Sequence, residues 1–344
     1  MNVAVEGLTL HPADPFGIAR GTSETVRAVL VEISHEGSTG IGAATPSAYY
    51  GETAASVRAT LDTLVGIVED IDDPHAGQHV AQRMADLAPD APAARSAVST
   101  ALADLAARDL GVPIYRQWGL DPARTPRTSY TVGLDTPDRM AEKAVAAREA
   151  GYPILKVKLG ADDGGDRERF AAVREAAPDA TIRVDANGGW SADRAIRAAD
   201  WLADGGVEFL EQPVPGDDLD GLRRVHEATA LPVCADEACV DAPDVARVAE
   251  ACDLVTVKLT KCGGLRPAVR QIHAADAHGL DVLLGCMLES NAAIAPACHL
   301  APLVEYADLD GALLLADDPI AGVPMPEGRI DLSAVDAGSG ARRR

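Results

Sequence analysis

The chain has 344 residues, of which 47% are hydrophobic and 24% are charged, and this composition excludes a disordered, collagen-like or coiled-coil protein. The 53 acidic and 31 basic residues give a net charge of −22, which disfavours nucleic acid and anionic membrane surfaces as partners. The sequence has neither a signal-peptide pattern nor an apolar run of about 18 residues, so we expect a cytoplasmic protein without a membrane span.

Residues 1–125 are expected to form an α+β capping domain. Strands followed by helices are typical of such a unit, and the proline-containing segment 121–126 resembles a linker at its end. The strand-like runs cover 2–10, 26–34 and 41–43, and the helical patterns lie near 53–71, 77–87 and 91–110.

Residues 126–316 alternate between β-rich runs and helical patterns. The helical pattern at 137–150 ends at Gly151, and the pattern at 191–203 begins with Ser191 as its N-cap. Eight βα units favour a closed (β/α)8 barrel of the α/β class over an open, doubly wound sheet. The eight β-rich runs are 128–132, 154–157, 181–184, 207–210, 233–235, 254–257, 281–284 and 306–309.

The last segment, residues 317–344, has no helical period. We expect it to return over the surface toward the capping domain, with residues 338–344 disordered.

A charged residue closes each of five consecutive strands of the predicted barrel. These residues follow one another at intervals of 22 to 27 positions, about one βα unit each. The carboxyl ends of barrel strands form the rim where active sites lie. For any one position an ordinary loop charge is the simpler interpretation, but five in register favour a site. The five are Lys158, Asp185, Glu211, Asp236 and Lys258.

The three carboxylates among these residues predict a metal site. Adjacent carboxylates in one pocket repel one another, and a hard cation with oxygen ligands relieves that repulsion. No histidine or cysteine closes these three strands, so Mg2+ or Mn2+ is favoured over Zn2+. We expect no organic cofactor.

The two lysines predict proton transfer. The second and sixth strands of an eight-stranded ring face each other, so Lys158 and Lys258 would flank one bound carbon from opposite faces. One lysine would remove the α-proton of a carboxylate substrate and the other would return a proton, while the cation stabilises the enediolate. Like-charge repulsion from the neighbouring Lys156 and Lys261 is expected to lower the pKa of the two bases.

These residues together resemble the muconate-lactonizing subgroup of the enolase superfamily, and the resemblance covers essentially the whole chain. The mandelate racemase branch is less similar, because no histidine closes the seventh strand at 283–289. The resemblance implies a homo-oligomer, a barrel with a capping domain, Mg2+ on the three carboxylates, an acid/base pair of lysines and assistance from Lys156 and Lys261. The matching segments are 156–158, 185–187, 211–213, 236–237 and 258–264, which add Asn187 and Glu237 as supporting residues.

The end of the eighth strand separates the reactions of this subgroup. Asp308 and Asp310 point the same way in a strand and would form an anionic site for a substrate ammonium. Solvated strand-end acids are an equal alternative on spacing alone. The Asp-x-Asp pattern also resembles the dipeptide epimerases, which implies a substrate similar to L-Ala-D/L-Glu, bound as a small molecule and inverted at its C-terminal α-carbon.

Other residues and functions stay open. Arg20 is a candidate partner for an acidic substrate side chain, and Glu289 and Ser290 are candidates for the pocket wall. Alternatives within the subgroup are an N-acyl amino acid racemase, an o-succinylbenzoate synthase and a muconate cycloisomerase. Alternatives from other classes are a metal-free Schiff-base lyase, which EDTA would not inhibit, and a non-catalytic barrel. The acidic composition also suggests a salt-adapted protein, which higher activity and stability in molar KCl than in dilute buffer would support.

Overall fold

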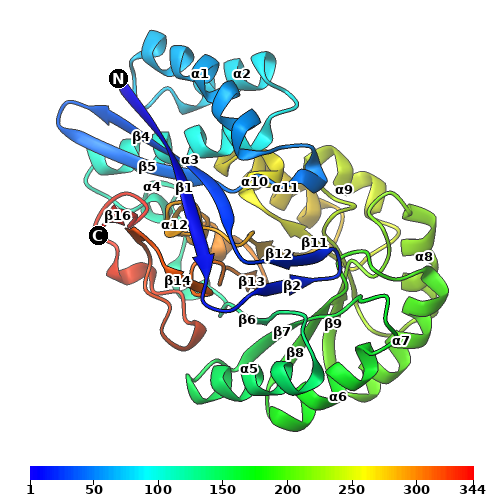
Figure 1. Ribbon diagram of the computed structural model, residues 1–344. Coiled ribbons are helices and arrows are strands. Elements are labelled where there is room, and N and C mark those ends of the chain that lie inside the picture. Colours follow the sequence, from blue (N-terminus) through cyan, green and yellow to red (C-terminus); the bar gives the residue numbers. More distant parts are fainter.

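The computed structural model describes all residues from 1 to 344. The N-terminal part is built on a four-stranded antiparallel sheet with the order β14-β1-β4-β5, and helices cover one of its faces (Figure 1). The strands are β1 (Asn2–Pro12), β4 (Val26–His35), β5 (Ser38–Ala44) and β14 (Leu315–Asp317), and the hairpin is β2 (Phe16–Ile18) with β3 (Gly21–Ser23). The helices are η1 (Ala48–Tyr50), α1 (Ala54–Ile71), α2 (Gly77–Leu87) and α3 (Pro92–Asp109).

The sheet is buried on both faces because apolar residues occupy both sides of β4. Val29, Val31 and Ile33 pack with α1, α2 and α3, while Ala28 and Leu30 belong to the core that continues into the barrel. Close packing of α3 on β5 also requires Gly42, where an added Cβ would lie 2.4 Å from the backbone nitrogen of Ala101. The sheet from which the hairpin and η1 extend is therefore packed against helices on one face and against the barrel core on the other.

The second part is a parallel eight-stranded sheet in sequential order from β6 to β13. Each of the eight expected strands is present, with ends shifted by at most two residues, and the (β/α)8 class is confirmed. One bridge between Thr128 and Ala307 joins the two edges and nearly closes the barrel. The strands are β6 (Tyr130–Val132), β7 (Ile154–Lys158), β8 (Thr181–Asp185), β9 (Val207–Glu211), β10 (Val233–Ala235), β11 (Leu254–Val257), β12 (Asp281–Gly285) and β13 (Tyr306–Asp308).

Helices surround this sheet (Figure 1). The expected helix at 191–203 is α7, where the Ser191 side chain accepts a hydrogen bond from the backbone N–H of Arg194. The helices are α5 (Pro137–Glu149), α6 (Asp166–Ala176), α7 (Ala192–Asp204), α8 (Leu219–Ala228), α9 (Ala242–Val248), α10 (Leu259–Cys262), α11 (Leu265–Ala277) and α12 (Asn291–Cys298). None of the helices combines the length and the apolar composition that a membrane span needs.

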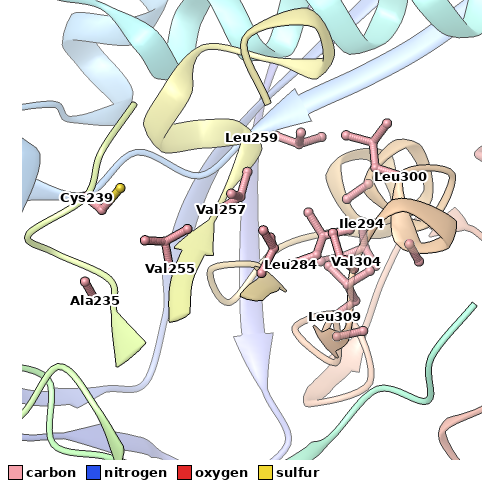
Figure 2. Packing of buried hydrophobic residues seen from close by; sticks show 14 of the residues in the cluster. Ala235, Cys239, Val255, Val257, Leu259, Leu284, Ile294, Leu300, Val304 and Leu309 are labelled. Carbon is pink, nitrogen blue, oxygen red and sulfur yellow. The ribbon is translucent and has the colours of Figure 1, made fainter. Parts of the chain in front are cut away.

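The barrel core consists mainly of aliphatic side chains. Figure 2 shows a part of it, in which Val257 and Leu284 come from neighbouring strands and Ile294 comes from α12. Such interdigitated aliphatic packing fixes the strand ends relative to one another.

The chain end, for which disorder is expected at 338–344, contacts the N-terminal part of the structure. The Ser339 hydroxyl and backbone N–H both donate to Asp104 Oδ1, at 2.9 and 2.6 Å. The Arg343 guanidinium donates hydrogen bonds to Glu6 and Glu32 of the N-terminal sheet.

Short elements connect these parts of the chain. They are α4 (Ile114–Gln117), η2 (Pro122–Arg124), η3 (Ala301–Leu303), β15 (Ile320–Ala321), η4 (Pro326–Gly328), η5 (Leu332–Ala334) and β16 (Arg342–Arg343).

Candidate active site

Parallel register brings the charged strand ends to one level. Lys158 of β7 is the register partner of Asp185 of β8, and Asp185 is the register partner of Glu211 of β9. Asp236 follows β10 directly and Lys258 follows β11. The five residues that the sequence predicts at the barrel rim therefore lie together.

Asp185, Glu211 and Asp236 form an acidic triad. One carboxylate oxygen from each lies within 4.8 Å of the others, and all three residues are buried. Burial raises the pKa of Glu211 to about 7, and Asp185 and Asp236 add to the shift against the pull of Lys156. Glu211 Oε2 is buried and accepts no hydrogen bond, although Lys156 Nζ lies 2.7 Å away as an ion-pair partner. Three hard oxygen donors in one buried cluster fit a divalent cation of the Mg2+ type.

Lys158 and Lys258 contact different members of the acidic triad. Lys158 Nζ donates to Asp185 Oδ2 at 2.6 Å, and Lys258 Nζ donates to Asp236 Oδ2 at 2.7 Å. The strands β7 and β11 stand four places apart in the ring, so the two ammonium groups enter from opposite sides. Burial by itself lowers the pKa of Lys258, but attraction by Asp236 outweighs it and the net pKa is raised. The neighbouring Lys156 does lower this pKa, but the carboxylate that pairs with the ammonium directly outweighs the effect, so the expected net depression is not found.

The two accompanying lysines differ in their roles. Lys261 Nζ is enclosed and donates to Asp236 Oδ1 and Asp236 O, both at 2.6 Å, and to the carbonyls of Cys239 and Thr256, both at 3.0 Å. It orients Asp236 and does not reach the cavity. Lys156 lies between two groups of acids, with Nζ 2.6 Å from Asp308 Oδ2 in addition to its contact with Glu211.

Asp308 and Asp310 are both buried at the end of β13, but they are not equivalent. Both oxygens of Asp308 are engaged, Oδ1 by the Ser129 hydroxyl at 2.5 Å and Oδ2 by Lys156. Burial opposes ionisation of Asp308, yet Lys156 lowers its pKa to about 2. Asp310 accepts the backbone N–H of Thr131 at 2.5 Å, through Oδ2, and burial together with the charge of Asp308 raises its pKa to about 7. Asp310 is thus the acid of this pair that has no ion-pair partner.

A cavity of about 440 Å³ lies over these strand ends, which is a size suited to a small-molecule ligand. The strand-end residues that line it are Lys156, Lys158, Asn187, Lys258, Asp308 and Asp310. Its other walls come from the hairpin of β2 and β3, the segment around η1, and the loop after β12. The capping domain therefore completes the cavity that the barrel begins.

Arg20 of the hairpin connects the capping domain to the barrel. Its Nη2 lies 2.8 Å from Glu237 Oε1, its Nη1 donates to the carbonyl of Asn187 at 2.6 Å, and the guanidinium lies 4.5 Å from the ring centroid of Tyr49. The expected role of Arg20 as a free partner for an acidic substrate is not what this geometry favours, because both terminal nitrogens already bind protein oxygens. Asn187 also donates through Nδ2 to Asp185 at 3.2 Å and to Glu237 at 3.3 Å, which links the supporting residues to the triad.

Glu289 and Ser290 lie outside the cavity wall, contrary to expectation. The Glu289 carboxylate accepts a hydrogen bond from the Thr260 hydroxyl at 2.7 Å, and burial raises its pKa. The Ser290 hydroxyl caps α12 and donates to Asp318 at 2.8 Å. The two side chains therefore connect the segment after β12 to α10 and to the residue that follows β14.

Three polar residues of the site were missed from the sequence. Thr256 donates to Glu211 Oε1 at 2.9 Å, and Ser129 donates to Asp308. Gln212 Oε1 accepts the backbone N–H groups of Asp236 at 2.8 Å and Ala238 at 3.1 Å. The alternation of β11 was an available signal for Thr256, since it lies two positions before Lys258 and shares its face.

Comparisons with known proteins cover nearly the whole chain. Residues 3–119 match the family model for the mandelate racemase/muconate lactonizing enzyme N-terminal domain, and residues 139–340 match the enolase C-terminal domain-like model. An L-Ala-D/L-Glu epimerase of Bacteroides thetaiotaomicron is 40% identical over 92% of this chain and 82% of its own. A hydrophobic dipeptide epimerase of Roseobacter litoralis is 38% identical over 99% of this chain and 98% of its own. The crystal structure of a dipeptide epimerase from Enterococcus faecalis V583, complexed with Mg and L-Leu-L-Tyr, has a TM-score of 0.92 at 32% identity and covers 99% of both chains.

Proposed function

Because the chain belongs to the mandelate racemase/muconate lactonizing enzyme family of the enolase superfamily, we propose that it epimerises a dipeptide at the α-carbon of its C-terminal residue. The membership confirms the resemblance found in the sequence. The observation that carries the proposal is the pairing of Lys158 and Lys258 with different carboxylates of one acidic triad, next to a buried acid pair at the end of β13. The relatives named for dipeptide epimerisation support the same reaction.

Lys158 and Lys258 would exchange the α-proton. One amine takes the proton from one face of the α-carbon, and the ammonium of the other lysine gives a proton to the opposite face, so the configuration inverts. Both lysines line the cavity, which brings their nitrogens to the space a substrate would fill. The same pair run in reverse returns the first epimer, as an isomerase requires.

Asp185, Glu211 and Asp236 would hold Mg2+ or Mn2+. When bound, such a cation supplies positive charge that stabilises the negative charge appearing on the substrate carboxylate as its α-proton leaves. Lys261 and Gln212 keep Asp236 oriented through its side-chain and backbone atoms.

Asp310 would bind the N-terminal ammonium of the dipeptide. Asp310 lines the cavity and has no ion-pair partner, and the buried charge of Asp308 increases the negative potential at this end of the cavity. Asp308 itself is held by Lys156 and Ser129 and would act through that charge. A carboxylate pair suits an ammonium and is unfavourable for the fully anionic substrates of muconate cycloisomerase or o-succinylbenzoate synthase.

Proton NMR in D2O tests the proposal. L-Ala-L-Glu and a panel of L-Ala dipeptides with apolar or basic C-terminal residues are incubated with the protein and Mg2+, with and without EDTA. The expected result is loss of the C-terminal α-proton signal and growth of the diastereomer signals, both abolished by EDTA. Absence of exchange in every dipeptide, with exchange in N-succinyl amino acids instead, would contradict the dipeptide assignment.

A further inference from the structure

A second cavity, of about 610 Å³, lies between the capping domain and the barrel, and it shares no lining residue with the active-site cavity. Helices α2 and α3 form one wall and α11 forms the other. Arg95 comes from α3, and Arg266 and Arg270 come from α11. We call this cavity the arginine groove, after these three residues.

The three arginines lack acidic partners. No ion pair within 4.0 Å joins Arg95, Arg266 or Arg270 to a carboxylate, in a chain with 53 acidic and 31 basic residues. In a protein with a net charge of −22, three cationic side chains therefore line one cavity without a carboxylate within 4.0 Å of them. Their charge is therefore available to a ligand.

Arg95 has a buried hydrogen-bond donor without an acceptor in the protein. Its Nη2 donates to the carbonyl of Pro89 at 3.1 Å, but its buried Nε–H has no acceptor. A buried donor without a partner destabilises the protein, and an acceptor from a ligand would satisfy it. Burial lowers the pKa of Arg95, and the charge of Arg270 adds to that shift while Glu52 and Asp241 oppose it. The guanidinium thus lies close enough to Arg270 to be repelled by it.

We propose that the arginine groove binds a small anion with more than one phosphate-type oxyanion group, bridging the capping domain and the barrel. A guanidinium presents a planar fork of donors that matches phosphate oxygens two at a time, and arginines from two sides suit a ligand with separated anionic groups. Gln78 and Trp118 add neutral polar and flat aromatic surface to the lining of the groove. The overall negative charge disfavours a long nucleic acid, whereas a small anion fits inside the groove.

The groove also adjoins the turn that carries a catalytic lysine. Gly263, with φ of 97°, lies directly against Arg95, since an added Cβ there would stand 3.1 Å from Arg95 Cζ. Gly263 ends α10, and Lys258 is the residue immediately before α10. The proposed anion would therefore sit behind the Lys258 turn without entering the active-site cavity.

Isothermal titration calorimetry with inorganic pyrophosphate tests this site, with EDTA present and at constant ionic strength. Orthophosphate and citrate are titrated in parallel, to separate polyphosphate from single-phosphate and carboxylate recognition. The exposed arginines of α11 are changed singly, as Arg266→Gln and Arg270→Gln, and Arg197→Gln on α7 removes an unpaired exposed charge elsewhere as the matched control. Arg95→Gln is compared once circular dichroism shows native secondary structure.

We expect one saturable pyrophosphate site per chain, weakened at least about tenfold by each groove variant and changed less than about twofold by Arg197→Gln. If citrate binds more tightly than pyrophosphate and the same variants weaken its binding, the ligand of the groove is a carboxylate and not a phosphate. Absence of saturable binding, or equal weakening by the control variant, would overturn the proposal. Binding that survives Arg270→Gln but disappears in Lys258→Met would place the anion in the active-site cavity and would also overturn it.

Discussion

Lys156 and Asp308 are 152 residues apart in the chain, and their side chains form an ion pair of 2.6 Å inside the barrel. The same ammonium lies 2.7 Å from Glu211 Oε2 and 3.4 Å from Asp185 Oδ2. One buried lysine thus connects the acidic triad with the acids at the end of β13. Attraction by these carboxylates holds the pKa of Lys156 well above its usual value although burial opposes its charge. The acidic triad and the acid pair at the end of β13 are therefore electrostatically joined.

Replacement of this lysine is expected to destabilise the fold. Lys156→Met leaves Asp308 and Glu211 buried without their cation, and breaking a buried ion pair in this way costs about 3–5 kcal/mol. Urea unfolding followed by circular dichroism, in the absence of divalent cations, measures the change. Lys143→Met is the control, since its pair with the partly exposed Asp135 is worth less than about 1 kcal/mol. Equal losses in both variants would argue against a special role of Lys156.

Single lysine variants are expected to separate the two faces of the α-carbon. Lys158→Ala and Lys258→Ala should each lower the epimerisation rate by at least about 100-fold, since each removes one of two proton-transfer groups. The remaining lysine should still exchange the α-proton of one epimer in D2O, and the two variants should prefer opposite epimers. NMR exchange with separate L,L and L,D substrates measures this pattern. Loss of exchange from both epimers in both variants, with native folding retained, would refute the two-base assignment.

Asp310 is expected to recognise the substrate ammonium. Asp310→Asn keeps the hydrogen bond to Thr131 N–H but removes the charge, so kcat/KM for a free dipeptide should fall at least about tenfold. The wild-type preference for a free over an N-acetylated dipeptide should shrink by the same factor. Asp317→Asn in β14, which is exposed and has no ion-pair partner, is the control for loss of one negative charge.

The same residue predicts a pH dependence. Burial and Asp308 raise the pKa of Asp310 to about 7, so its carboxyl becomes protonated and neutral as pH falls through that value. The kcat/KM for a free dipeptide should therefore decrease below about pH 7, and this decrease should be absent in Asp310→Asn. If an acidic limb of the same size persists in the variant or with the N-acetylated substrate, it belongs to another group, such as Glu211.

The strand-end residues could be predicted from the sequence because the parallel register makes them equivalent. Once β7, β8 and β9 are recognised as neighbours, Lys158, Asp185 and Glu211 must lie at the same edge. The alternation of side chains along a strand similarly explains why Lys156 and Lys158 both face the interior. Local periodicity and chain order were sufficient for this part of the site.

Residues on loops could not be predicted in the same way. Arg20 binds Glu237 and the carbonyl of Asn187, 167 residues away, and neither contact follows from a local pattern. Glu289 was expected in the cavity, but its carboxylate accepts a hydrogen bond from Thr260, which lies in α10 after a different strand. The chain end was expected to be disordered because it is a terminus, and the contact of Ser339 with the buried Asp104, 235 residues away, does not follow from a local pattern either. Such contacts depend on the packing of the two domains rather than on local sequence.

Metal binding is expected to stabilise the protein and to require the acidic triad. A cation that binds only the folded state at about 100 times its Kd adds about 2.7 kcal/mol to the free energy of unfolding. Thermal unfolding with Mg2+ or Mn2+ should therefore show a higher Tm than with EDTA. Glu211→Gln should remove this shift, while Glu227→Gln on the exposed face of α8 should keep it. A shift of equal size in Glu211→Gln would indicate that the cation binds elsewhere.

Acid should weaken the fold at His299, which connects α12 to the chain end. Its Nδ1 accepts the backbone N–H of Tyr115 at 3.1 Å, and its Nε2 lies 3.1 Å from the carbonyl of Ser339, so the neutral ring satisfies both partners. Burial lowers its pKa to about 4 from 6.5, although the Ser339 carbonyl opposes the shift.

The unfolded state therefore binds more protons than the folded state between these two pH values. The contribution of His299 is fully present above about pH 6.5 and is lost as pH falls toward 4, by about 3 kcal/mol in total. Urea unfolding of wild type and His299→Gln at pH 7 and pH 4 measures it as a difference that shrinks with acid. The control is His79→Gln on the exposed face of α2, for which the difference in free energy of unfolding from wild type should be the same at both pH values. If the difference for His299→Gln is also the same at both pH values, protonation of His299 does not weaken the fold.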